Sequence, residues 1–203
     1  MRAWCAWVQR VLGIHVEVKD HNGSDWNTPR HMRAFVWGEE EHWSYGPSFP
    51  ALRLTIRNNI FIGTNPASFL RMKPGGTYYS STKILGNTFY GGGIHADGIQ
   101  LNSTSGNLLR DNIIKGSVHI TDRAAWDVSY NCYPDGNPPG EPLGANASTA
   151  NPLFANPGGT AAADYKLQST SPVRSTGVEL SDLTNDYWGI ARTSPGSLGA
   201  HEF

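Results

Sequence analysis

The feature that most constrains the fold is a six-residue phrase that returns along the chain. It consists of an aliphatic residue, two variable residues, asparagine, one variable residue and a large apolar residue, and it begins at Ile56, Ile84, Leu109 and, more weakly, Val128. Its asparagines are Asn59, Asn87, Asn112 and Asn131. Self-similarity at intervals of roughly 20 to 30 residues is typical of folds that stack one small unit on the next.

The segments between the asparagines predict three short strands in each repeat. A short apolar strand that ends at glycine follows the asparagine, in residues 60–63, 88–91 and 113–116. An alternating strand comes next, in residues 70–72, 99–101 and 118–120, and the phrase then begins again. Strands with a period of two that stack on their counterparts predict a coil of triangular section, with the asparagines bonded to one another at one corner.

Residues 52–135 therefore resemble a right-handed parallel β-helix of the pectate-lyase-like superfamily, an all-β solenoid with three strands per coil. The tail resembles the closing segment of bacterial β-helix proteins, carried by residues 151–157, 164–167, 171–172 and 199–203. The resemblance implies one domain of residues 1–203, with clear coils in 51–135 and an irregular C-terminal cap in 136–203. That cap is expected to cover the open C-terminal end of the solenoid.

Residues 1–50 are the weakest part of the prediction. Segments 13–18 and 33–37 are candidate strands of a partial N-terminal coil, although no asparagine phrase accompanies them. We therefore expect the chain to begin inside the solenoid, as the C-terminal portion of a longer protein. The resemblance implies an extracellular or cell-surface location, although Met1 to Leu12 do not form a secretory signal.

Composition narrows the classes of partner. The chain has a net charge of −1, without the excess of basic residues that a nucleic-acid-binding protein carries. No apolar run approaches the length of a membrane span. The two cysteines, Cys5 and Cys132, are predicted to be free thiols, with Cys132 in a core column. A polysaccharide is the expected partner by resemblance, and the oligomeric state stays open.

The outward positions of the alternating strand are the place where chemistry is expected. They form one column of Arg71, Gln100 and His119, and a neighbouring column that includes Lys73 and Asn102. Strands spaced about 4.8 Å apart would make these columns a polar strip of sugar-binding length. A solvated sheet face is polar in any protein, so a purely structural interpretation stays open.

The segment from Gly93 to Gln100 is the sharpest local motif, and it resembles a His-x-Asp-Gly-Ile-Gln phrase of carbohydrate-active β-helix proteins. It is expected to place His95 and Asp97 in a loop just before the groove strand, with Gln100 on that strand. An imidazole, a carboxylate and an amide on one rim can bind hydroxyls or transfer a proton. The alternative is that Asp97 only caps a turn before Gly98.

Two kinds of chemistry are open. A uronic-acid lyase needs a cation to offset developing charge and a base, for which Arg71 and either His119 or His95 are the candidates. A glycoside hydrolase needs two carboxylates, and Asp97 and Asp122 are predicted to lie too far apart, at opposite ends of their strands.

Cofactor use stays unknown. Calcium is possible, but the groove strand has no acidic cluster like the calcium site of pectate lyases. The acidic run at 39–41 stands next to Trp43, which is a candidate for stacking on a sugar ring, although a solvated loop is the more common meaning of such a run.

These observations favour a polysaccharide-binding or polysaccharide-cleaving protein, a lyase or a glycoside hydrolase. Its expected catalytic residues are His95, Asp97, His119 and Arg71, and its expected substrate-binding residues are Gln100, Lys73, Asn102, Asp122 and Trp43. The alternative is a non-catalytic carbohydrate-binding, adhesion or structural segment of a larger protein, because the fold alone does not decide between these functions.

Overall fold

The protein is built from short strands. The computed structural model describes residues 16–19, 53–62, 70–72, 82–91, 94–96, 106–116, 118–120, 123–136 and 143–203. Within these residues there are eleven strands and two 3₁₀ turns, η1 (Arg123–Ala125) and η2 (Ala162–Tyr165), and there is no α-helix. The fold of the described part is therefore all-β, as the sequence predicts.

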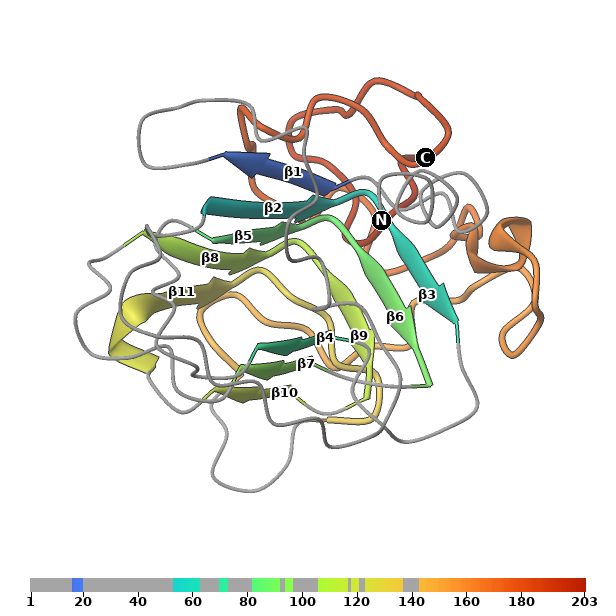
Figure 1. Cartoon of the computed structure of the whole chain (residues 1–203). Coiled ribbons are helices and arrows are strands. Elements are labelled where there is room, and N and C mark those ends of the chain that lie inside the picture. The colour runs from blue at the N-terminus through green and yellow to red at the C-terminus, as the bar shows by residue number, and fades with distance from the viewer. Residues whose placement is uncertain are drawn as a thin grey trace, which may run out of the picture.

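Three sheets enclose the core, and the chain visits them in turn (Figure 1). The five-stranded sheet has the order β1 (Val16–Lys19), β2 (Arg53–Arg57), β5 (Lys83–Leu85), β8 (Asn107–Arg110) and β11 (Trp126–Ser129). The second sheet contains β3 (Ile60–Ile62), β6 (Thr88–Tyr90) and β9 (Ile113–Lys115). The third contains β4 (Leu70–Met72), β7 (Ile94–Ala96) and β10 (Val118–Ile120). Every pairing among these strands is parallel except that of β1 with β2.

Like residues stack in the core because the strands pair in register. Ile56, Ile84 and Leu109 are aligned on neighbouring strands and have no exposed surface. Phe61 and Phe89 are also aligned, and their rings stack with centroids 4.6 Å apart. Burial of such columns of large apolar side chains supplies the main stabilisation of the fold.

The four asparagines form a continuous ladder at the corner between the first and second sheets, as predicted. The Oδ1 of Asn87 accepts the backbone N–H of Asn59 at 2.9 Å, and the same contact joins Asn87 to Asn112 at 2.9 Å and Asn112 to Asn131 at 3.0 Å. All four residues are buried. The ladder satisfies backbone groups that the corner would otherwise leave without partners.

The residue before each ladder asparagine has a left-handed backbone, which turns the corner. The φ angles there are +53° at Asn58, +58° at Gly86, +56° at Asp111 and +55° at Tyr130. Glycine, asparagine and aspartate tolerate this conformation best, so three of these four residues suit the position.

One strand of the third sheet differs from the prediction. Ile94–Ala96, and not residues 99–101, pairs with both β4 and β10. Only residues 91–93, three glycines, separate β6 from β7, and a similarly short corner at 116–117 separates β9 from β10. The prediction assumed that the second and third strands of this sheet are followed by loops of equal length. Instead, β4 and β7 are each followed by ten residues before the next strand begins.

The N-terminal strand also differs. Segment 16–19 is a strand, but it runs antiparallel to β2, with Val16 opposite Ile56 and Lys19 opposite Arg53. It therefore does not belong to an earlier coil of the same parallel stack, and it pairs with the outer edge of β2 instead. The other candidate segment, 33–37, lies outside the described residues.

Residues 143–150 continue the parallel stacking beyond β11. Ala145 bridges to Ser129, and Ser148 bridges to Cys132, both in the parallel sense. The partly buried Leu143 and Ala147 pack against the core at this end. The boundary of the irregular segment thus lies later than residue 136.

Residues 151–203, which we call the tail, run back along the side of the sheets (Figure 1). Phe154, Tyr165, Leu167, Val173 and Leu198 form a second apolar cluster with Ile113 and Cys132. Outward residues of the same sheet, Ile60, Ile62 and Tyr90, pack against this cluster. The tail therefore covers the flank of the β3–β6–β9 sheet, whose outward residues Ile60, Ile62 and Tyr90 are partly buried beneath it.

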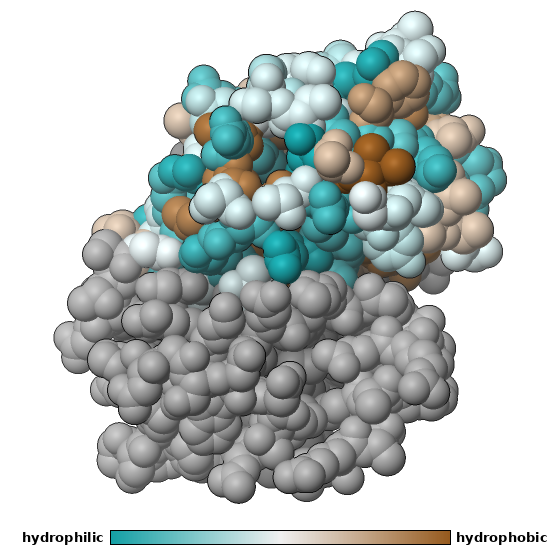
Figure 2. Space-filling model, turned by 90° about the horizontal axis from the view of Figure 1, so that it is seen from above, coloured by the Kyte–Doolittle hydropathy of each residue, from teal (hydrophilic) through white to brown (hydrophobic). Residues whose placement is uncertain are grey.

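The solvent side of this region has a different character. Figure 2 shows that the described part of this face is largely hydrophilic, with small separate hydrophobic spots. The exposed large apolar residues among those described are Ile190 and Phe203, about half exposed each. The tail therefore joins an apolar inner side to a solvated outer side, as a covering segment should.

Two glycines with nearly equal φ angles allow a matched test of the turn after residue 142. Gly144 has φ +85°, and a Cβ there would lie 2.0 Å from the carbonyl O of Val128, whereas Gly189 has φ +82° and open space around it. We expect Gly144→Ala to lower the free energy of unfolding by about 3 kcal/mol or more, and Gly189→Ala by only about 1–2 kcal/mol. Chemical denaturation measures both, and equal losses would contradict the contact with Val128.

Candidate functional site

The third sheet aligns three of the predicted catalytic residues. Arg71, His95 and His119 are the central residues of β4, β7 and β10, and the register pairs Arg71 with His95 and His95 with His119. Neighbouring strands lie about 4.8 Å apart, so the three residues occupy one row across the sheet. The prediction had Gln100 in the middle of this row, and His95 takes that place instead.

His119 shows which face of the third sheet the row occupies. Its neighbours Val118 and Ile120 are 1% and 3% exposed, and Ile94 on the adjacent strand is 1% exposed. His119 itself is half-buried, so its side chain lies on the face opposite to the core. The register positions of Arg71 and His95 belong to the same face of this sheet.

The corrected register changes the arrangement of two predicted acids. Ala96 and Ile120 are aligned, so Asp97 and Asp122 follow, in sequence, the same ends of two neighbouring strands. The prediction put them at opposite ends because it took residues 99–101 as the strand. The loop position expected for His95 is likewise wrong, because His95 lies within β7.

The other predicted site residues lie outside the described residues. These are Asp97, Gln100, Lys73, Asn102, Asp122 and Trp43. Among the residues that are described, no group of three or more His, Cys, Asp and Glu side chains is placed to hold a metal ion. No helix in the described ranges has the length and apolar character needed to cross a bilayer.

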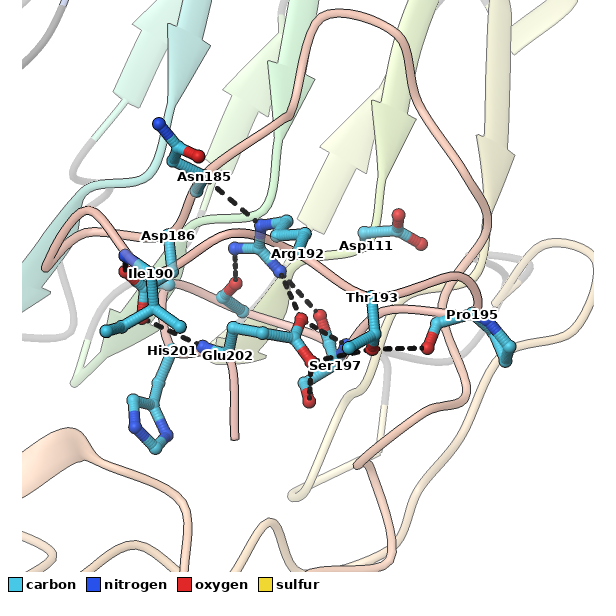
Figure 3. A network of polar contacts seen from close by, with 12 residues as sticks. Asp111, Asn185, Asp186, Ile190, Arg192, Thr193, Pro195, Ser197, His201 and Glu202 are labelled. Atoms are coloured by element: carbon cyan, nitrogen blue, oxygen red, sulfur yellow. Dashed lines mark hydrogen bonds and ion pairs between the residues drawn. The ribbon is translucent and has the colours of Figure 1, made fainter.

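A buried network of charged and polar groups lies elsewhere, where the tail meets the asparagine corner (Figure 3). Arg192 is at its centre, with a side chain that is only 6% exposed. Its Nη2 donates to the carbonyl O of Gly199 at 2.6 Å and to Oδ1 of Asn58 at 3.1 Å. Its Nη1 donates to the carbonyl O of Ser197 at 2.8 Å and lies 3.7 Å from Oε2 of Glu202. Burial lowers the pKa of Arg192, although the surrounding carboxylates oppose this effect.

Two of the buried carboxylates in this group are well supplied with donors. Asp186 accepts the backbone N–H groups of Trp188 and Ile190 at 2.8 Å on Oδ1, and that of Glu202 at 3.0 Å on Oδ2. Glu202 accepts the N–H of Ser197 at 2.9 Å and the hydroxyls of Thr193 at 3.0 Å and Ser197 at 3.2 Å. Each of these carboxylates therefore has hydrogen-bond donors on both of its oxygens, which offset the cost of burying it.

The third buried carboxylate, Asp111, has far less support. It is 3% exposed, and Oδ1 accepts the backbone N–H of Val178 at 3.1 Å. Burial raises the pKa of Asp111 to about 6, although the Val178 N–H, Arg192 and Arg110 each act to lower it. Sequence reasoning missed this group, because nothing local marks residues so far apart as neighbours.

An aromatic row lines the outside of the same part of the tail. Trp188 contacts Tyr187 and His201 edge-on, with centroids 4.9 and 5.3 Å apart, and Lys166 Nζ lies 4.8 Å from the Trp188 ring centroid. His201 Nδ1 accepts the N–H of Leu167 at 3.0 Å. Burial lowers the pKa of His201, an effect that Asp186 opposes. These contacts explain the row as packing within the tail.

The buried Cys132 carries no sign of reactivity. It has no exposed surface, its Sγ lies 3.2 Å from the carbonyl O of Ala150, and it is free, as predicted. Burial raises the pKa of its thiol to about 12, which keeps the reactive thiolate scarce near neutral pH. The other cysteine, Cys5, lies outside the described residues.

The sequence finds no match among protein-family models or curated proteins. The candidate site therefore depends on the register of the third sheet and on the chemistry of its outward residues.

Proposed function

We propose that the chain is a right-handed parallel β-helix of the pectate-lyase-like type that binds and cleaves a polysaccharide on the outer face of the β4–β7–β10 sheet. The order in which the chain visits three parallel sheets, and the buried asparagine ladder, support this fold. A face of stacked parallel strands suits a polymer, since equivalent positions repeat from one strand to the next.

The alignment of Arg71, His95 and His119 is the observation that carries the proposal. An arginine and two histidines at aligned register positions favour a substrate that carries carboxylates, such as a polymer of uronic acids. In β-elimination, Arg71 would offset the charge that develops on the uronate carboxylate. His95 or His119 would remove the proton from the adjacent carbon, the electron pair would form a C=C bond, and the glycosidic oxygen on the next carbon would leave with a proton from solvent.

A glycoside hydrolase is the second candidate, and the corrected register is the reason to keep it. Asp97 and Asp122 follow the same ends of β7 and β10, which are adjacent strands. Retaining and inverting glycosidases place their two carboxyl groups roughly 5 to 9.5 Å apart, a span that one or two strand spacings cover. Binding without cleavage is the remaining alternative, and it uses the same face.

The experiment that tests the proposal is a screen of uronic-acid and neutral polysaccharides with two readouts, unsaturated product by ultraviolet absorbance and new reducing ends. Elimination gives both signals, and hydrolysis gives reducing ends alone. Retention of a polysaccharide on affinity gels without either product would leave a binding function. Absence of binding and of product across the panel would contradict the proposal.

On the substrate so identified, we expect His119→Ala and Arg71→Ala each to lower kcat/KM by roughly 100-fold or more, because each removes a group from the row. Lys115→Ala is the matched control, since Lys115 is a cation of the neighbouring sheet that pairs with Asp135 at 2.7 Å. Its kcat/KM is expected to stay within about twofold of that of the original protein. Equal losses in all three variants would indicate a general effect of surface charge rather than this site.

A further inference from the structure

Asp111 lies where the tail is fastened to the asparagine corner. Its backbone turns the corner before Asn112, and the tail reaches it with two segments. The N–H of Gly199 donates to the carbonyl O of Asp111 at 2.6 Å, and the N–H of Val178 donates to its carboxylate at 3.1 Å. Gly177 packs so closely that a Cβ there would lie 3.1 Å from Oδ1 of Asp111. The carboxyl of Asp111 is therefore enclosed by the docked tail.

The charges around this carboxyl do not balance. Three buried carboxyl groups, Asp111, Asp186 and Glu202, share the field of one buried guanidinium, that of Arg192. Arg110, the other cation near Asp111, is already paired with Asp127. Asp186 and Glu202 each accept several hydrogen bonds, whereas Asp111 accepts one at its carboxyl. Asp111 is thus the least supported carboxyl group of this cluster, and its burial favours the protonated form.

We propose that the carboxyl of Asp111 is a proton-controlled latch, which fastens the tail to the corner more tightly when it is protonated than when it is ionised. The two states differ by one proton on one oxygen, and no other covalent change is required. The tail contacts β2, β5, β6 and β9 through other groups as well, so ionisation loosens this fastening without removing the remaining contacts.

The direction of the pH effect follows from the raised pKa. The pKa of Asp111 is about 6 with the tail docked, against an ordinary value of 3.8 when the carboxyl is solvated. Below pH 3.8 the carboxyl of Asp111 is protonated whether the tail is docked or undocked, and docking is strongest. Docking weakens as the pH rises from about 4 to about 6 and then stays constant, with a total change of roughly 100-fold in the docking equilibrium. His201 has the opposite effect on docking. Its pKa is lowered when the tail is docked, so its contribution to docking strengthens as the pH rises.

Amide hydrogen exchange of the full chain by NMR tests the latch. The reporters are the amides of Val178 and Gly199, which donate to Asp111, and their protection is corrected for the intrinsic effect of pH on exchange. We expect the protection to fall by up to about 100-fold between pH 4 and pH 7. Asp111→Asn should remove this fall and keep the protection near its acid value, because asparagine stays neutral. The left-handed corner accepts the change, since Asn58 holds the equivalent corner position with φ +53°.

Asp127→Asn is the control variant. Asp127 pairs with the same Arg110. Hydrogen bonding to that arginine lowers the pKa of Asp127, so its pKa shift is opposite in direction to that of Asp111. The fall in tail protection should persist in this variant, although it becomes smaller because the released Arg110 favours the ionised form of Asp111. Carboxyl-carbon NMR on the unsubstituted protein gives a second measurement that needs no folded variant. A titration of Asp111 close to its ordinary pKa, or an unchanged fall in protection in Asp111→Asn, would overturn the proposal.

Discussion

Arg192→Met is expected to lower the free energy of unfolding by about 3–5 kcal/mol, because it leaves buried carboxylates without their cation. The guanidinium is almost completely enclosed and joins Asn58 on the corner to Ser197 and Gly199 on the tail. Methionine keeps much of the side-chain volume but supplies none of these hydrogen bonds. Chemical denaturation monitored by circular dichroism measures the loss, and amide exchange in the tail shows where it acts.

A second substitution distinguishes the loss of charge from the loss of packing in Arg192→Met. Glu202 lies 3.7 Å from Arg192 and keeps its Ser197 and Thr193 donors when the arginine is removed. If the unpaired carboxylate causes the loss, Arg192→Met combined with Glu202→Gln recovers at least about 1 kcal/mol relative to Arg192→Met alone. Lys166→Met is the control on the same tail, since Lys166 Nζ lies over the Trp188 ring, and it should cost about 1 kcal/mol or less. Equal losses in the arginine and lysine variants would show that Arg192 has no special role.

Asn112→Ala is expected to lower the free energy of unfolding by about 3–5 kcal/mol, because several buried polar groups lose their partner together. Asn112 Oδ1 accepts both the backbone N–H and the Nδ2 of Asn87, at 2.9 and 3.0 Å. Its own Nδ2 donates to the carbonyl O of Ile84 and of Arg110, at 2.9 and 2.8 Å. No water can replace these contacts easily, since both asparagines are fully buried.

Asn156→Ala provides the comparison for the ladder. Asn156 is exposed, and its Nδ2 donates to Asp164 at 3.2 Å. Its replacement should cost less than about 1 kcal/mol, because water can satisfy the groups that it leaves. The two variants remove the same side chain, so denaturation curves with equal midpoints would contradict the contribution of the ladder.

The repeated phrase predicts much of the fold because its signals are local and periodic. Ile56, Ile84 and Leu109 are aligned in the core as the phrase requires, and the asparagines that follow them are bonded in series. Each signal lies within a few residues of the strand that it marks. Stacking of identical units then converts a local pattern into a long-range arrangement.

The third sheet shows where this reasoning fails. Residues 94–96 and 99–101 both offer an apolar residue on either side of a polar one, so the pattern alone does not choose between them. The structure pairs residues 94–96 with β4 and β10, which moves His95 from a loop into the row with Arg71 and His119. A shift in strand assignment therefore changed the composition of the candidate site.

One sequence feature indicates that the second sheet is covered on its outer face. Ile60, Phe61 and Ile62 form a continuous apolar run, whereas a strand with one solvated face alternates. Phe61 faces the core, and Ile60 and Ile62 pack against the tail cluster. The run therefore indicates a sheet that is covered on both faces, although it does not identify the covering segment.

The all-β class, the corner asparagines and most strands can be predicted from the sequence, because they follow from local spacing and from side chains that repeat. The residues that share the row on the third sheet and the charges that meet around Arg192 depend on how distant segments pack. Asn58, Asp111, Arg192 and Glu202 are brought together by the path of the tail. Burial among these distant groups, and no property of the residues alone, sets the proton affinity of Asp111.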